Sequence, residues 1–187
     1  MAGELNGVRV AFLTANEGVE QVELTEPWQA VRDAGGVSEL VAPETGTVQG
    51  FNHVDKADTF DVHRTIRDAD PTDYSALVLP GGVVNADELR IAPGAVTFVQ
   101  RLVENAKPVA VICHGPWILV EAGLVRGRTL TSWPSLATDI RNAAGTWVDE
   151  EVHVDTAGPN TLVSSRKPDD LPAFCQNLVK VFAEKRV

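Results

Sequence analysis

Short apolar runs rich in β-branched residues alternate along the chain with longer segments in which apolar residues recur every three or four positions. The first pattern is typical of buried parallel strands, and the second is typical of helices that pack one face on a sheet. We expect the main strands at 8–14, 37–42, 74–79 and 109–112, and the helices at 23–34, 92–106, 117–122, 135–144 and 171–184. This alternation predicts an α/β fold with a mostly parallel central sheet covered by helices on both faces.

The polar segments between these elements predict loops and minor strands. Residues 15–22 are read as an acidic loop, and the helix that follows would hold Pro27 in its first turn, where a missing N–H group costs little. Residues 44–61 favour a hairpin or an edge segment, and short strands are expected at 128–132, 152–155 and 161–165. Since no repeat, low-complexity tract or linker interrupts the pattern, we expect residues 1–187 to form a single domain.

The most informative stretch is 107–119, where an apolar run, a tight turn and a helix follow one another with a cysteine at the turn. The run predicts a buried strand that ends at Cys113, and Gly115 and Pro116 predict the turn into the helix. A nucleophile elbow uses this layout to expose a reactive atom above the carboxyl end of a sheet. Backbone N–H groups at the start of the helix favour the thiolate, so Cys113 is predicted to be a nucleophile.

A second predicted strand, at 74–79, runs directly into a Pro-Gly-Gly turn and ends at the same edge of the sheet. Gly81 and Gly82 allow the backbone to approach a ligand closely and to direct N–H groups into a cleft. We expect the amides of Gly82 and His114 to form an oxyanion hole. Gly115 and Trp117, on the other side of the thiol, complete the expected substrate-binding surface.

Three further side chains are candidates for moving or orienting a proton. Glu23 opens a helix at the edge that holds the thiol, so its carboxyl group is expected to lie close to Cys113 and to exchange a proton with it. His114 follows Cys113 directly and would need a carboxylate to orient its ring. Asp87 and Glu88, just after the Gly-Gly turn, are candidates for that carboxylate.

Other histidines and cysteines give weaker signals. His153 and Asp155 share a strand face through their two-residue spacing, so a Cys/His/acid triad that uses them is an alternative. An edge histidine with a nearby acid is more often a surface pair. Cys175 lies among apolar residues of the last helix and is expected to pack there, whereas His53 and His63 lie in polar segments that suggest no site.

Composition narrows the classes of function. The 187 residues carry a formal net charge of −10, which argues against a nucleic-acid backbone or an anionic membrane as the main partner. The chain shows no apolar run long enough to cross a bilayer and no secretory signal, and its two cysteines lie far apart, so we expect a protein of the reducing cytoplasm. Metal-ligand, phosphate-loop and dinucleotide motifs are missing, which predicts no metal and no cofactor.

Six stretches together resemble the DJ-1/PfpI family, in particular the branch of PfpI-type intracellular proteases and bacterial stress-response deglycases. They are residues 13–17, 22–24, 79–82, 110–116, 127–134 and 163–166. The resemblance implies a flavodoxin-like three-layer sandwich of class I glutamine-amidotransferase type, with Cys113 as nucleophile and Glu23 as the acid beside it. It also implies a homodimer or homohexamer whose site lies at an interface, where His114 meets Asp87 from a neighbouring subunit.

The leading hypothesis is a cofactor-free thiol enzyme of stress defence, a deglycase or glyoxalase that acts on methylglyoxal, glyoxal and their protein adducts. Cys113 would attack the adduct, Glu23 and His114 would move protons, and lactate or glycolate would leave. Peptide hydrolysis is one alternative, because it needs the same nucleophile, proton carriers and oxyanion hole. A non-catalytic redox sensor or chaperone that works through oxidation of Cys113 is the other.

Overall fold

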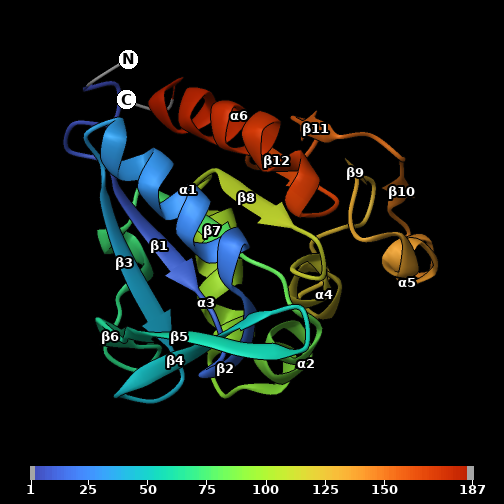
Figure 1. Ribbon diagram of the computed structural model, residues 1–187. Helices are drawn as coiled ribbons and strands as arrows, with labels where there is room; N and C mark the ends of the chain where they lie inside the picture. The colour runs from blue at the N-terminus through green and yellow to red at the C-terminus, as the bar shows by residue number, and fades with distance from the viewer. Residues whose placement is uncertain (1–2, 185–187) are drawn as a thin grey trace.

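A computed structural model describes residues 3–184, and in it a twisted sheet lies between two layers of helices (Figure 1). The strand order in the sheet is β11 (Val152–Asp155), β12 (Leu162–Ser165), β8 (Val109–Ile112), β7 (Ala76–Leu79), β1 (Arg9–Leu13), β3 (Val37–Ala42) and β6 (Arg64–Thr65). Neighbours from β12 to β6 are parallel, and β11 runs antiparallel to β12. The structure therefore confirms the predicted flavodoxin-like sandwich with a mostly parallel sheet.

The helices pack on both faces of this sheet. They are α1 (Gln21–Asp33), α2 (Val83–Ile91), α3 (Ala95–Glu104), α4 (Pro116–Glu121), α5 (Ala137–Asn142) and α6 (Leu171–Glu184). Val10 and Phe12 of β1 share a core with α1 and α6, whereas Ala11 and Leu13 share the opposite core with α3 and α4. This alternation follows from the two-residue period of a strand and gives each face its own apolar core. No helix within residues 3–184 is long and apolar enough to cross a bilayer.

Two smaller sheets complete the fold: β9 (Thr129–Leu130) with β10 (Thr146–Trp147), and β2 (Glu17–Glu20) with β4 (Thr47–Asn52) and β5 (Asp55–Asp61). The antiparallel pair of β4 and β5 confirms the hairpin predicted for 44–61. The loop predicted at 15–22 is wrong, because β2 pairs with β4 there. Since α1 starts at Gln21, Pro27 lies in its second turn, where it withholds the N–H group that would bond to the Glu23 carbonyl.

The hydrophobic pattern fails to predict α2. Its Val83, Val84 and Ile91 are at least half exposed and its Asn85 is buried, although Ala86 and Leu89 face the interior as in an ordinary surface helix. The exposure of Val83 and Val84 reflects the place of the helix beside a pocket, as described below.

Other boundaries agree more closely with the pattern. Strand β3 and helix α6 occupy 37–42 and 171–184, as predicted. The helix predicted at 92–106 is shorter in the structure, because Gly94 adopts a left-handed conformation with φ of +83° and α3 begins only after it.

A buried ion pair fixes the sheet at its β11 edge. The Arg128 Nε group donates to Asp155 Oδ1 at 2.8 Å, and its terminal nitrogens donate to the side chain and backbone of Asn160 and to the Asp155 carbonyl. Both charged side chains are about 5% exposed, so each charge depends on the other for solvation.

Replacing Asp155 with alanine is therefore expected to lower the free energy of unfolding by about 3–5 kcal/mol, because it leaves the Arg128 charge buried without a partner. Urea unfolding followed by circular dichroism measures the change. As a control, Asp149→Ala breaks an exposed 2.8 Å pair with Arg166 and should cost less than about 1 kcal/mol. Equal losses in the two variants would show that burial does not set the cost.

Candidate active site

Cys113 occupies a strained turn between β8 and α4. Its φ of +61° lies in the left-handed region, which a residue with a side chain adopts at a cost of about 1–2 kcal/mol. The neighbouring chain holds this conformation in place: the Cys113 N–H donates to the Ser165 carbonyl at 3.1 Å, and the Trp133 N–H donates to the Cys113 carbonyl at 2.9 Å. The structure thus has the strand, sharp turn and helix of a nucleophile elbow, as the sequence predicts.

Glu23 lies beside this thiol, fully buried in the first turn of α1. The Gly81 N–H donates to Glu23 Oε2 at 2.9 Å, and a Cβ atom on Gly81 would lie 2.5 Å from that oxygen and 2.6 Å from the Cβ of Cys113. Glycine is therefore required for the acid and the thiol to meet. Burial raises the pKa of Glu23 to about 8, although its contact with the Cys113 thiol opposes the shift. The carboxyl group consequently keeps its proton at neutral pH.

The surroundings of the thiol act on its pKa in opposite directions. Burial and then the neighbouring Glu23 charge raise the pKa of Cys113 above its ordinary value, while the amides of Gly82 and His114 lower it. These two amides thus point at the sulfur, and the oxyanion hole expected of them remains a prediction. The thiolate expected from the sequence also remains a prediction, because in a single chain the loss of hydration opposes the two amide dipoles. Removal of the thiol proton by a base would offset the effect of burial.

His114 is placed to be that base. Its Nδ1 lies 3.1 Å from the Cys113 Sγ, and among residues 3–184 the thiol is the only hydrogen-bond partner of the ring. The imidazole is 7% exposed and stacks on the Trp133 ring at 5.8 Å, with the edge of Trp117 at 5.3 Å. Burial lowers the pKa of His114 to about 4, so the ring is neutral at pH 7, and the same shift makes it a weaker base than a free imidazole.

Asn85 of α2, which the sequence analysis does not identify, fixes the Gly-Gly turn. Its Oδ1 accepts from the Ala15 N–H at 2.7 Å, and its Nδ2 donates to the carbonyls of Pro80 and Gly81 at 3.2 and 2.9 Å. The side chain is 1% exposed and ties the ends of β1 and β7 together. A buried asparagine shortly after two glycines is the signal that could have revealed it.

Other predicted residues lie near this centre without lining its pocket. Asp87 and Glu88 are exposed on α2, and the Asp87 carboxylate makes no contact with His114 in the described chain. Trp117 packs behind the His114 ring and donates its Nε1–H to Asp139 at 2.9 Å. Gly115 lies in the turn and allows β8 and β7 to approach each other. The expectation that Gly115 and Trp117 bind substrate therefore remains a prediction.

A pocket of about 480 Å³ opens above the thiol. Besides Cys113, Glu23 and His114, its lining includes Glu20, His53, Val54, Val83, Val84 and Trp133. His53, for which the sequence suggests no site, lies at the tip of the β4–β5 hairpin and lines this pocket. Its polar sequence context holds no local signal of this, since the hairpin is positioned by pairing with β2.

The alternative triad does not form. The His153 Nδ1 lies 2.7 Å from Glu150 Oε2, an exposed pair of the kind expected for an edge strand. Asp155 is engaged by Arg128, as described above. Within residues 3–184, no group of three histidine, cysteine or acidic side chains could hold a metal ion.

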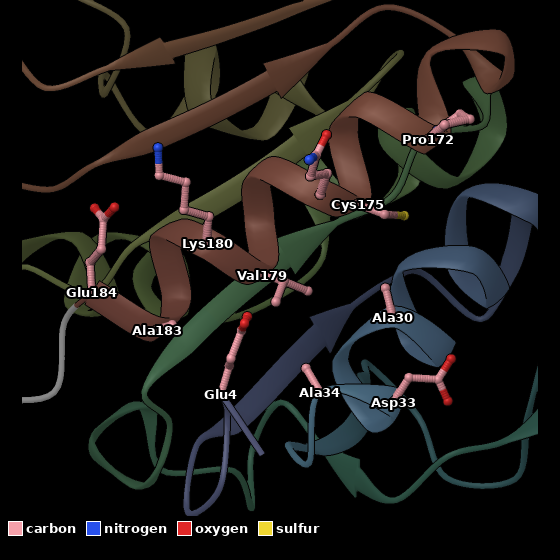
Figure 2. A pocket seen from close by; sticks show the side chains of 11 residues that line it. Glu4, Ala30, Asp33, Ala34, Pro172, Cys175, Val179, Lys180, Ala183 and Glu184 are labelled. Atoms are coloured by element: carbon pink, nitrogen blue, oxygen red, sulfur yellow. The ribbon is translucent and has the colours of Figure 1, made fainter. Parts of the chain in front are cut away.

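Cys175 lies apart from the elbow. It is half-buried on α6 and faces a cavity of about 880 Å³ between α6 and α1, with Ala30 and Ala34 on the opposite wall (Figure 2). No residue that lines this cavity also lines the pocket of Cys113. Burial raises the pKa of Cys175 to about 12, which disfavours the thiolate, and the side chain packs against the core between α1 and α6, as predicted.

The fold and this geometry define an α/β protein with a thiol at a nucleophile elbow, flanked by a neutral histidine and a protonated carboxyl group. The chain belongs to the DJ-1/PfpI family, which it matches over residues 8–181. It is 41% identical over 174 residues to Deglycase PH1704 of Pyrococcus horikoshii, an alignment that covers 93% of this chain and 99% of the relative.

Two further comparisons agree. YraA of Bacillus subtilis, whose name proposes a cysteine protease, is 35% identical over 166 residues, which cover 89% of this chain and 93% of that protein. A solved Anabaena variabilis structure with DJ-1/ThiJ/PfpI-like and ferritin-like domains superposes with a TM-score of 0.84 at 29% identity, over 92% of this chain and 47% of that one. The family and fold expected from the sequence are confirmed.

Proposed function

We propose that the protein is a cysteine-dependent deglycase that removes methylglyoxal or glyoxal from amines and thiols, and that acts on the free aldehydes through the same intermediate. The observation that supports this most directly is the Cys113 Sγ, 3.1 Å from Nδ1 of His114 and beside the protonated Glu23, at the base of an open pocket. The name of the Pyrococcus horikoshii relative points to the same reaction.

In the first stage the sulfur replaces the amine of the adduct. A C–S bond forms at the carbinol carbon and the C–N bond breaks, while the thiol proton passes through Nδ1 of the neutral His114 to the departing nitrogen. The amides of Gly82 and His114, which already converge on the sulfur, are available to stabilise negative charge on the neighbouring oxygen.

In the second stage a proton moves from the sulfur-bearing carbon to the adjacent carbonyl carbon. The protonated Glu23 donates to the carbonyl oxygen that becomes negative and takes back the proton of the carbinol hydroxyl group, so the product is a thioester of lactate or, from glyoxal, of glycolate. Water then cleaves the thioester and restores the thiol. The overall reaction converts the adduct and water into the free amine and a hydroxy acid. It needs no external oxidant or reductant. The reducing cytoplasm that we propose as its location keeps Cys113 as a thiol.

A second copy of the chain completes this site in our proposal. His114 has no carboxylate partner within residues 3–184, and Asp87 stands exposed on α2, beside Val83 and Val84 at the pocket rim. Packing of two α2 helices around a twofold axis would exchange Asp87 between subunits and orient each His114 ring.

The variant Asp87→Asn is expected to lower kcat/KM about tenfold without lowering the thermal midpoint, because it withdraws the charge that orients the imidazole. Glu88→Gln, an equal change of charge one residue away, serves as the control. Native mass spectrometry reports the assembly. A monomer with full activity would contradict the shared site.

Peptide hydrolysis is the second candidate, and the name of YraA favours it. Wild-type protein and Cys113→Ser are assayed in parallel with methylglyoxal adducts and with fluorogenic peptides, and lactate and free fluorophore are measured. Lactate release that is lost in Cys113→Ser supports the deglycase. Peptide cleavage without lactate release would favour the peptidase over the deglycase. Equal turnover by wild type and Cys113→Ser would refute any role of the thiol. Peroxide oxidation of Cys113 without turnover of either substrate would favour the redox sensor.

A further inference from the structure

The Cys113 pocket is lined by acidic side chains without basic ones. Among the described residues that line it, Glu20 and Glu23 are acidic and none is a lysine or an arginine. Glu23 keeps its proton and His114 is neutral at pH 7, for the reasons given above. Glu20 is therefore the carboxylate whose charge the pocket presents to a bound molecule, and this conclusion builds on the proposed function of the same site.

The Glu20 carboxylate is held in a defined position. Glu20 is the last residue of β2 and precedes α1, yet its side chain does not cap that helix. Instead the carboxylate accepts the backbone N–H of His53 at the hairpin tip, with N–O distances of 3.1 and 3.4 Å to its two oxygens. The Glu20 backbone N–H in turn donates to the Gly81 carbonyl at 3.3 Å. One shared donor leaves acceptor capacity on both oxygens for a ligand.

The rest of the pocket strengthens the effect of this charge. Val54, Val83 and Val84 from the hairpin and from α2 form an apolar rim, and a ligand seated between them excludes water from the Glu20 carboxylate. Attraction between opposite charges grows as the surrounding dielectric falls. The Glu20 charge also acts on the catalytic groups, since it is one of the causes that raise the pKa of Glu23.

We propose that Glu20 is a specificity-determining residue. Its charge makes the enzyme prefer adducts of arginine, whose guanidinium group is cationic, over adducts of a neutral thiol. A guanidinium keeps its positive charge after one nitrogen has added to an aldehyde. Its remaining N–H groups match the geometry of a carboxylate, which an ammonium matches less well. The carboxylate thus binds the part of the substrate that leaves, while Cys113 reacts with the carbon.

The test uses two methylglyoxal adducts as probes, one of Nα-acetylarginine amide, which is cationic, and one of N-acetylcysteine amide, which is neutral. In the variant Glu20→Gln the amide oxygen can still accept the His53 N–H, so the hairpin tip keeps its hydrogen bond and only the charge is lost. We expect kcat/KM for the arginine adduct to fall about tenfold, and kcat/KM for the cysteine adduct to stay within about twofold.

Glu17→Gln is the matched control. It removes one negative charge from the same strand, but Glu17 faces Lys56 at 3.8 Å and does not line the pocket, so both rates should remain at the wild-type value. A second measurement needs no variant. The wild-type preference for the arginine adduct should shrink as the NaCl concentration rises, because salt screens the attraction.

Equal losses on both adducts in Glu20→Gln, or a wild-type preference that does not respond to salt, would overturn the role of Glu20 and leave the deglycase intact. Wild-type protein that turns over neither adduct would instead refute the proposed function itself.

Discussion

Glu23→Gln is expected to lose at least about 100-fold in kcat/KM while becoming more stable than the wild type at neutral and alkaline pH. Glutamine fits the cavity and its oxygen can still accept the Gly81 N–H, which now donates to Glu23 Oε2 at 2.9 Å. It cannot transfer a proton, so the reaction loses the acid beside the thiol.

The gain in stability follows from the sign of the pKa shift. Burial raises the pKa of Glu23 from 4.5 to about 8, so between these values the unfolded chain ionises this group and the folded chain does not. The stability that the protonated group provides is complete below about pH 4 and is lost as pH rises toward 8, by about 1.4 kcal/mol for each unit. Glutamine has no such loss.

Urea unfolding of both proteins from pH 4 to pH 8 measures this difference. The free energy of unfolding of Glu23→Gln should exceed that of the wild type by an amount that grows across this range and reaches on the order of 2–4 kcal/mol at pH 8. The difference is smaller than the full pKa shift of Glu23 would give, because the titrations of Glu23 and Cys113 are coupled. Glu26→Gln, an exposed position on the same helix, should follow the wild-type curve. Parallel curves for wild type and Glu23→Gln would show that the buried carboxyl group is ionised throughout.

Gly81→Ala is expected to remove more than about 99% of activity and to cost about 1–3 kcal/mol of stability. The added methyl group would lie 2.5 Å from Glu23 Oε2, 2.6 Å from the Cys113 Cβ and 3.0 Å from the His114 nitrogen. These atoms are buried and held by the elbow, so none can move away without separating acid from thiol. Gly81 lacks a positive φ, which makes the effect purely steric.

Gly145→Ala is the matched control for this steric effect. Its added methyl group would also be crowded, 2.9 Å from both Ile140 Cγ2 and the Val125 carbonyl, but it lies between α5 and β10, away from the pocket. It should lose stability and keep its kcat. Circular dichroism and the deglycase assay, applied to both variants, separate the two effects. Full activity in Gly81→Ala would mean that Glu23 and Cys113 need not touch.

Local sequence carried much of the fold and the centre of the site. Apolar runs located the buried strands, and a cysteine between such a run and Gly-Pro located the elbow, because strand, turn and helix each leave a pattern within a few residues. Glu23 is predictable for a related reason, since a residue in the first turn of a helix at the sheet edge is held close to that edge. The hydrophobic pattern does not reveal α2, because Asn85 is buried through hydrogen bonds to Ala15 and Pro80, which follow β1 and β7 and lie outside its own segment.

The sequence by itself determined the sheet, the thiol, the acid beside it and Gly81, which lets the two meet, since each depends on neighbours in the chain. The tertiary structure alone decided that His53 and Val54 line the pocket of the thiol, that Trp133 stacks on His114, and that burial raises the pKa of Cys113. The physical reason is that the hairpin tip reaches the pocket through a hydrogen bond between residues 33 positions apart, and that the pKa of a thiol depends on burial, which no short stretch of sequence encodes.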